Sequence, residues 1–366
     1  MRYIHQLSAW PAFTWHHDKV EKPLASVRHR QGLLLGKLEG LGFQFREQAS
    51  LENLTLDVIK TSEIEGEKLP VDQVRSSLAK KLGIKQAGLA SAGRDVEGVV
   101  EMMLDATQKY NQPLTDKRLF TWHASLFPTG RSGMQNISVA RWRNDESGPM
   151  EVVSGALGKE KVHFIAPEAL RLKDEMKYFL TWFNSNEEHD PVLKAALAHL
   201  WFVTIHPFDD GNGRMARAIA DMQLSRSDHS KQRFYSMSAQ IRKERTEYYS
   251  ILEKTQRGSL DITGWLLWFI ECLNRSFTAS TENLKGVLNK AKFWEKNQRT
   301  LLNERQRMML NKLMENFNGK LTSSKWAKIT KASPDTALRD IHDLIHKGIL
   351  QKEDGGGRNT HYTLTL

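Results

Sequence analysis

Apolar residues recur at helical spacing along most of the chain, and this periodicity restricts the fold more than any other feature. The stretch 192-VLKAALAHLWFVTI-205 is apolar on every side, which is typical of a helix at the centre of a protein. Strand patterns are confined to 150–166 and 348–366. The sequence therefore predicts an all-α protein in which the strands form only small hairpins.

Breakers and capping residues divide this pattern into helices. The second helix is expected to run from Leu51 to Glu65, because Gly66 suits a C-terminal cap and Pro70 follows it. The predicted helices span 18–41, 51–65, 70–82, 94–111, 115–126, 167–185, 190–205, 213–226, 239–257, 261–285, 304–317 and 323–330, with one more after Ser333.

Length and composition limit the class of protein. The 366 residues suggest two or three domains. Cys272 is the single cysteine, which excludes an internal disulfide and a thiolate zinc cluster. No apolar run reaches the roughly 20 residues of a membrane span, and the N-terminus lacks the pattern of a signal peptide. We expect a cytoplasmic protein with no membrane partner.

The positive charge is concentrated at the C-terminus. The net charge is +10, and residues 287–366 hold 15 Lys and Arg against 8 Asp and Glu, an excess of +7. Three helices followed by a strand, a glycine turn and a strand predict a winged helix-turn-helix there. DNA is one expected partner. Because the third helix carries Asp335, Asp340 and Asp343, a protein contact is an equal alternative.

The segment 206-HPFDDGNGRMAR-217 follows the central apolar helix. Pro207 disfavours helical geometry at His206, so this histidine is expected at the mouth of a loop. Gly211 and Gly213 can adopt positive φ, which lets successive backbone N–H groups converge on an anion. A loop of this composition predicts a phosphate site.

A second helix begins directly after this loop, and its N-terminus adds a positive dipole. Arg214 and Arg217 are three residues apart and share a face of its first turn. Asp210 is placed to hold a Mg²⁺ that bridges phosphates, and His206 to accept a proton from a hydroxyl. The plainer alternatives are a structural His206 and an Arg217 paired with Asp221.

This segment resembles the signature of the Fic family, HxFx[DE]GNGRxxR. The fixed positions are matched by His206, Phe208, Asp210, Gly211, Asn212, Gly213, Arg214 and Arg217. Fic proteins mostly transfer AMP from ATP to Ser, Thr or Tyr hydroxyls of proteins. The resemblance implies that His206 is the general base and that Phe208 anchors the loop. It also implies that Asp210 binds Mg²⁺, with Mn²⁺ as an alternative, and that Gly211, Asn212, Gly213, Arg214 and Arg217 hold ATP.

The resemblance extends to two other segments. The predicted hairpin near 150–166 is similar to the family's flap, which docks the target protein by strand pairing. The run 244-ERTEYYSILE-253 resembles the segment that flanks the adenosine, so Tyr248 and Tyr249 are candidates for ATP binding. Core packing is the alternative for each tyrosine.

The segment 61-TSEIEGE-67 resembles the inhibitory pattern [ST]xxxE[GN] of the family. Thr61, Glu65 and Gly66 occupy its fixed positions. In this family the glutamate pairs with the second arginine of the motif, here Arg217, and takes the space of the ATP γ-phosphate. Glu63 and Glu67 have no role in the pattern, and we expect them to be solvated.

Together these features predict an N-terminal helical segment with the inhibitory helix (1–93), a Fic domain (94–286) and a winged helix (287–366). The expected function is transfer of AMP from ATP to target proteins and to the chain itself, inhibited by Glu65. Removal of AMP by the same site, transfer from another nucleotide, and a DNA-binding regulator with a sensor Fic core are the alternatives. A homodimer is compatible with the sequence.

Overall fold

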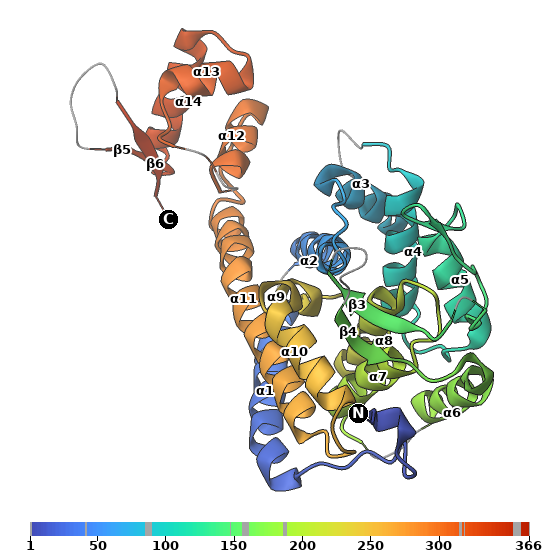
Figure 1. Cartoon of the computed structure of the whole chain (residues 1–366). Helices are drawn as coiled ribbons and strands as arrows, with labels where there is room; N and C mark the ends of the chain where they lie inside the picture. Colours follow the sequence, from blue (N-terminus) through green and yellow to red (C-terminus); the bar gives the residue numbers. More distant parts are fainter. Residues whose placement is uncertain are drawn as a thin grey trace. The chain divides into compact units, whose positions relative to one another are not determined.

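The structure is a computed structural model that describes residues 2–40, 42–84, 90–146, 148–155, 161–185, 189–314, 317, 319–353 and 360–365. The chain divides into two compact units, Met1–Ser280 and Thr281–Leu366 (Figure 1). The helices of the first unit are η1 (Ile4–Gln6), α1 (His17–Glu39), α2 (Phe43–Ile64), α3 (Val71–Leu82), α4 (Arg94–Gln108), α5 (Asp116–Leu126), η2 (Ala169–Arg171), α6 (Leu172–Asn184), α7 (Pro191–Ile205), α8 (Asn212–Asp228), α9 (Met237–Lys243) and α10 (Arg245–Gln256). Helix α11 (Thr263–Lys296) begins in the first unit and ends in the second.

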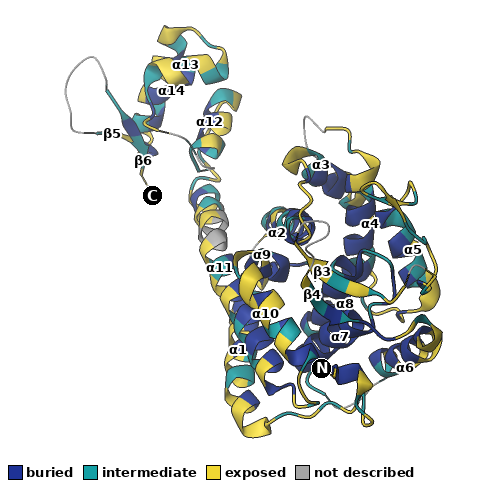
Figure 2. Cartoon of the chain, viewed as in Figure 1, coloured by how far each residue is buried: buried dark blue, intermediate teal, exposed yellow. Residues whose placement is uncertain are grey.

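Helix α7 forms the centre of the first unit, as its apolar sequence predicts. It begins at a capped end, where Asp190 accepts a hydrogen bond from the backbone N–H of Val192 and Pro191 takes the first helical position. Every residue from Val192 to Ile205 is buried (Figure 2). Helix α8 packs along α7 more extensively than any other helix does. The loop between these two helices is therefore held from both sides.

Helix α2 is fixed to α9 by a buried carboxylate. Asp57 Oδ1 accepts hydrogen bonds from Ser236 Oγ at 2.6 Å and from Ser238 N at 3.3 Å. Ser236 also caps α9 by accepting from Ala239 N. Burial raises the pKa of Asp57. A buried carboxylate is stable only when its hydrogen-bond partners are in place. These bonds therefore fix the position of α2 against α9.

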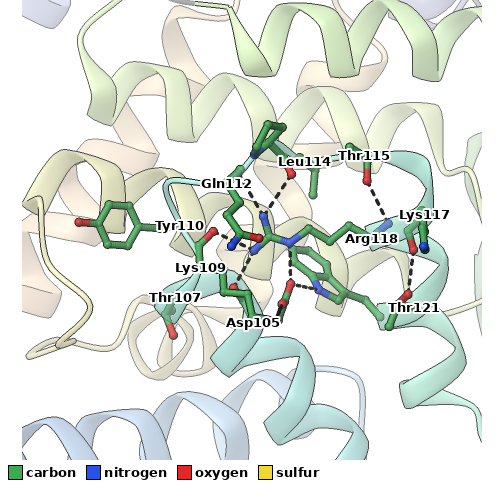
Figure 3. A network of polar contacts seen from close by, with 12 residues as sticks. Asp105, Thr107, Lys109, Tyr110, Gln112, Leu114, Thr115, Lys117, Arg118 and Thr121 are labelled. Atoms are coloured by element: carbon green, nitrogen blue, oxygen red, sulfur yellow. Dashed lines mark hydrogen bonds and ion pairs between the residues drawn. The ribbon is translucent and has the colours of Figure 1, made fainter.

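Arg118 joins the end of α4 to the start of α5 (Figure 3). Its guanidinium donates to the carboxylate and to the carbonyl oxygen of Asp105, and to the carbonyl of Lys109 at 3.1 Å. Trp122 Nε1 donates to the same carboxylate at 2.7 Å. These bonds tie the C-terminal turn of α4, whose Asp105 carbonyl also accepts from Lys109 N, to α5, so the network is structural.

The strands form two-stranded antiparallel pairs. In the first unit β1 (Arg131–Ser132) pairs with β2 (Gln135–Asn136), which the sequence pattern did not indicate. The hairpin expected near 150–166 consists of β3 (Glu151–Ser154) and β4 (Lys161–Ile165). The residues that connect the two strands, 156–160, lie outside the described residues.

Several helix limits differ from the prediction. Helix α2 begins at Phe43 rather than at Leu51, and α11 continues to Lys296. The single helix expected over 239–257 is two helices that meet at Glu244. The carboxylate of Glu244 accepts two hydrogen bonds from Arg275, at 2.6 and 2.7 Å, which stabilises the bend without a glycine or proline.

The second unit contains α12 (Glu304–Met314), α13 (Ser323–Thr330), α14 (Pro334–His346) and the pair β5 (Leu350–Lys352) and β6 (Tyr362–Leu364). Its core includes Trp326, Ile341 and Leu344. The carboxylate of Asp340 accepts two hydrogen bonds from Arg305, at 2.8 and 3.0 Å, so it is not a free charge on the third helix. The predicted glycine turn at 354–357 lies outside the described residues, and the winged-helix interpretation stays a prediction.

Within the described parts of the chain, the helices lack the combination of length and apolar character that crossing a membrane requires.

Candidate functional site

The loop between α7 and α8 has the backbone geometry that its residues predict. His206 caps α7 with φ 51, in the left-handed region, and Pro207 follows it. Gly211 caps the N-terminus of α8 with φ 82. A Cβ atom at Gly211 would lie 2.9 Å from the Phe127 ring, so a larger residue is excluded by both conformation and space. The loop therefore presents His206 beside the start of a helix.

Phe208 and Asn212 close this loop. Phe208 is fully buried, and its ring stacks on His123 with 4.3 Å between centroids. Asn212 Nδ2 donates to Phe208 O at 2.7 Å, and Asn212 Oδ1 accepts from Phe208 N at 3.0 Å. The side chain of Asn212 is thus occupied within the loop. The prediction that Asn212 holds phosphate therefore depends on its backbone N–H, which belongs to the first turn of α8.

His123 and Arg143 support the loop, and the sequence pattern did not single them out. His123 Nε2 is 3.2 Å from Asp210 O, and burial lowers the pKa of His123 to about 4. The neutral ring therefore donates from Nε2 to that carbonyl. The guanidinium of Arg143 donates from Nε to His206 O at 2.8 Å and from Nη2 to Pro167 O. The backbone N–H of Arg143 donates to Pro207 O at 3.0 Å.

We expect Arg143→Ala to lower the free energy of unfolding by about 2–4 kcal/mol, because it leaves buried carbonyl groups without donors. The Arg143 side chain is fully buried, whereas Arg141 is exposed. Arg141→Ala is therefore the matched control. Urea denaturation of the two variants measures the difference, and equal free energies would contradict the role assigned to Arg143.

The ring of His206 is arranged as a proton acceptor. Its Nδ1 lies 3.2 Å from Val203 O, so the neutral ring donates from Nδ1 and leaves the lone pair on Nε2. Burial lowers the pKa of His206 to about 4, with Arg143 acting in the same direction and Asp210 and Glu65 opposing it. The imidazole is therefore neutral near pH 7.

Arg217 is held by the predicted inhibitory segment at the end of α2. Its Nη2 lies 2.7 Å from Glu65 Oε1, and its Nε lies 2.8 Å from Thr61 Oγ1. The same Nη2 donates to Thr61 O at 3.0 Å. The side chain of Arg217 is only 2% exposed, so its ion pair with Glu65 lies in an environment of low dielectric constant. The structure thus contains the expected pair of Glu65 with Arg217.

Glu65 lies on the N-terminus of α8. A Cβ atom at Gly213 would lie 2.2 Å from Glu65 Oε1, so only glycine leaves room for this carboxylate. The negative charge is stabilised there by the positive end of α8. Gly66 follows with φ 91 and turns the chain away from the helix. The Glu65 carboxylate therefore occupies an anion site built from the loop and Arg217.

Glu67 is exposed and Glu63 is partly exposed, as expected, but both carboxylates also have ion-pair partners. Glu67 Oε2 lies 2.7 Å from Arg214 Nη1, because the turn at Gly66 brings Glu67 back toward α8. Glu63 bonds Lys60 at 2.8 Å on its own helix. Two carboxylates of one segment thus hold both arginines of the motif.

A cavity of about 630 Å³ opens beside this site. Its lining includes Glu65, His206, Gly213, Val153, Tyr249 and Glu253. Residues from the predicted flap, from the motif loop and from α10 thus meet around one space. This volume lies within the range of about 300–1,000 Å³ that is typical of small-molecule sites.

The two candidate tyrosines differ in their surroundings. Tyr248 is 1% exposed, and its hydroxyl bonds His199 at 2.9 Å, so it is largely a core residue that also borders the cavity. Tyr249 is 37% exposed, and its hydroxyl lies 3.4 Å from Glu65 Oε2. Tyr249 is therefore the more accessible of the two tyrosines that line the cavity.

Asp210 is the motif carboxylate that directly precedes Gly211. Its oxygens accept hydrogen bonds from Gly211 N and Ser132 Oγ. Among the described residues no three His, Cys, Asp or Glu side chains form a cluster that could hold a metal ion. One carboxylate together with ligand phosphates is the usual protein site for Mg²⁺, so this donor set fits that ion when phosphates are bound.

The geometry defines a helical domain with an anion-binding loop, and the comparisons with known proteins assign it to a class. Residues 113–224 match the Fic/DOC family. The chain therefore contains a Fic domain. Residues 3–84 match a domain of unknown function, DUF4172.

Curated relatives support the same class. The chain is 28% identical over 207 residues to the protein adenylyltransferase Fic of Aedes aegypti, a match that covers 55% of this chain and 38% of that protein. It is 27% identical over 213 residues to the protein adenylyltransferase fic-1 of Caenorhabditis elegans, covering 57% and 38%. The chain thus spans about two fifths of the length of these relatives.

Solved structures share the fold. A Fic family protein from Desulfovibrio desulfuricans superposes with a TM-score of 0.55 at 18% identity, covering 97% of this chain and 98% of that one. A Fic domain-containing protein from Bacteroides thetaiotaomicron gives 0.51 at 20% identity, covering 73% and 97%. The mostly helical fold with small strand pairs is that of Fic proteins.

Proposed function

We propose that this protein transfers AMP from ATP to hydroxyl side chains of proteins and that Glu65 inhibits the transfer. The observation that carries the proposal is the position of the Glu65 carboxylate, which pairs with Arg217 and lies beside Gly213 at the N-terminus of α8, where an anion is stabilised. The names of the curated relatives support the choice of AMP transfer among reactions that use phosphates.

In this proposal the triphosphate binds the N–H groups of the loop together with Arg214 and Arg217. His206 Nε2 takes the proton of the acceptor hydroxyl while its oxygen attacks the α-phosphorus, and pyrophosphate leaves. Mg²⁺ held by Asp210 would neutralise phosphate charge, and Mn²⁺ would serve the same purpose. The neutral state of His206 near pH 7 suits this role.

The acceptor protein would dock on β3 and β4, whose outer edge offers strand pairing near the cavity. We assign residues 1–93 to an N-terminal helical segment that contains the inhibitory helix, residues 94–286 to the Fic domain and residues 287–366 to a winged helix. The basic last segment would contact DNA or a protein, and the chain would act in the cytoplasm. Because α2 is fixed by Asp57, release of Glu65 needs only a local change at the end of that helix.

The experiment that tests the proposal compares nucleotides. The Glu65→Gly variant is incubated with ATP, GTP, CTP or UTP labelled at the α-phosphate, in Mg²⁺, and protein-bound label is counted. We expect label from ATP above the other three, and none on an added acceptor protein with the Glu65→Gly/His206→Ala variant. Label from another nucleotide alone would overturn the donor assignment, and label on the acceptor protein that survives loss of His206 would overturn the mechanism.

We expect Glu67→Gln to raise the transfer rate up to about fivefold, because its pair with Arg214 is half exposed and such pairs contribute at most about 1 kcal/mol. Glu63→Gln is the control, since Glu63 pairs with Lys60 and not with the motif. The rates of AMP incorporation measure the effect. An equal gain in both variants would show that general loosening of α2, and not release of Arg214, is responsible.

The state of the general base gives a separate prediction. Because burial lowers the pKa of His206 to about 4, its neutral form should persist as pH falls and be lost only near that value. The carbon-bound proton resonance of the His206 ring, identified by its loss in His206→Ala, should keep its neutral position from about pH 8 to about pH 5.5. A midpoint near the ordinary value of about 6.5 would contradict this assignment.

A further inference from the structure

The hairpin beside the cavity contains a β-bulge at His163. Val152 is opposite Phe164, but the next residue, Val153, is opposite Val162. His163 is therefore the extra residue of strand β4. A bulge turns a side chain out of the regular alternation of the sheet, and bulges are common next to active sites.

This bulge places His163 between a hydroxyl and a carboxylate. Its Nε2 lies 2.6 Å from Ser154 Oγ on the neighbouring strand, and its Nδ1 lies 2.7 Å from Glu253 Oε2 on α10. The hydrogen bond from His163 lowers the pKa of Glu253, so the carboxylate is ionised near pH 7. Nδ1–H then donates to Glu253, which leaves Nε2 to accept the Ser154 hydroxyl proton.

Arg257 holds this arrangement in place. It donates to the carbonyls of His163, at 3.0 Å, and Val162, at 2.9 Å, and it pairs with Glu253 at 3.2 Å. Strand β4 is thus attached to α10 without any contribution from Ser154. The contact between Ser154 and His163 is not needed to fix the strand, which argues against a purely structural role for the hydroxyl.

A hydroxyl, an imidazole and a carboxylate in this order form the arrangement that makes serine nucleophilic. Ser154 is exposed, and it lines the same cavity as His206 and Glu65. An activated hydroxyl therefore lies on the wall of the space in which the nucleotide is proposed to bind.

We propose that Ser154, activated by His163 and Glu253, is the hydroxyl that accepts AMP when the protein modifies itself. This inference rests on the proposed function for its donor, ATP. Ser154 Oγ attacks the α-phosphorus, forming an oxygen–phosphorus bond, and the bond from that phosphorus to the bridging oxygen breaks. Pyrophosphate leaves with the bonding electrons, and the hydroxyl proton passes to His163 Nε2, whose positive charge faces Glu253.

The test uses the full chain with Glu65→Gly, incubated with ATP and Mg²⁺ and mapped by tandem mass spectrometry of its peptides. We expect AMP on Ser154, loss of that modification in Ser154→Ala, partial recovery in Ser154→Thr, and a decrease of about tenfold or more in His163→Gln. Ser259→Ala is the control, because Ser259 is exposed and bonds only the backbone of Asp261 among the described contacts. AMP mapped elsewhere, with Ser154→Ala modified as fully as the parent, would overturn the proposal.

A fluorophosphonate probe separates this inference from the proposed function, since it labels nucleophilic serines without ATP. We expect Ser154 to be labelled far faster than Ser259, and the difference to disappear in His163→Gln. Equal labelling of the two serines would show that Ser154 is not activated, whatever the outcome with ATP. Preferential labelling of Ser154 with no AMP transfer to any protein would overturn the acceptor role and the proposed function together, while leaving the activated serine established.

Discussion

Glu65→Gly should raise the initial rate of AMP incorporation by about 10²-fold over wild type, because it frees Arg217 and the N-terminus of α8 for the triphosphate. In the proposed mechanism, the Glu65 carboxylate would repel the nucleotide, so that ATP would bind with its α-phosphorus displaced from the attacking hydroxyl. Incorporation of label from ATP under initial-rate conditions measures the change.

The stability of this variant should fall only slightly. Thr61 keeps two hydrogen bonds to Arg217, so we expect a cost of about 1–2 kcal/mol, which urea denaturation reports. Glu63→Gly is the matched control, since it places the same flexible residue in the same helix and leaves Arg217 paired. If Glu63→Gly were as active as Glu65→Gly, weakening of α2 and not removal of the carboxylate would explain the activation.

His206→Ala should lower the rate of AMP transfer to an added acceptor protein by about 10²–10⁴-fold in the Glu65→Gly background, the range that loss of a general base typically causes. Binding of ATP should change little, because the anion site is formed by other groups of the loop and α8. The combination of an unchanged affinity with a lost rate is what distinguishes a proton acceptor from a binding residue.

His229→Ala provides the matched control. His229 also caps a helix in the left-handed region, with φ 49, but it is exposed at the far end of α8. The two substitutions therefore change the same residue type in the same backbone conformation. An equal loss of activity in both would indicate that capping, and not proton transfer, is what His206 contributes.

The central part of the site could be predicted because its residues determine their own backbone. Pro207 ends α7 at His206, and Gly211 permits the left-handed turn that starts α8. The position of Arg217 on the first turns of that helix then follows from helical geometry. Its pairing with Glu65 was predicted only from the resemblance to the Fic family, because a local sequence pattern does not identify a partner 152 residues away.

The parts that were missed depend on contacts between distant segments. Glu67 reaches Arg214 only because Gly66 reverses the chain, and an isolated stretch of acidic residues does not reveal that partner. The side chain of Asn212 is taken by the loop itself, through two bonds to Phe208. Arg143 contacts the loop from a segment that has no regular structure of its own.

The hydrophobic pattern of the sequence also did not predict the bend between α9 and α10 or the bulge at His163. Glu244 is stabilised by Arg275, and nothing in the sequence near 244 interrupts helical spacing. In strand β4 the alternation of 161-KVHFI-165 predicts that His163 faces the same side as Lys161 and Ile165. One extra residue changes that direction and brings His163 to Glu253.

The intact mass of three proteins, incubated in parallel with ATP and Mg²⁺, tests the account most directly. We predict that Glu65→Gly gains the mass of AMP and also transfers AMP to an added acceptor protein, while wild type gains little and Glu65→Gly/His206→Ala leaves the acceptor protein unmodified. Equal gain in wild type and Glu65→Gly would contradict inhibition by Glu65, and the absence of any gain in Glu65→Gly, with or without an added acceptor protein, would contradict AMP transfer itself.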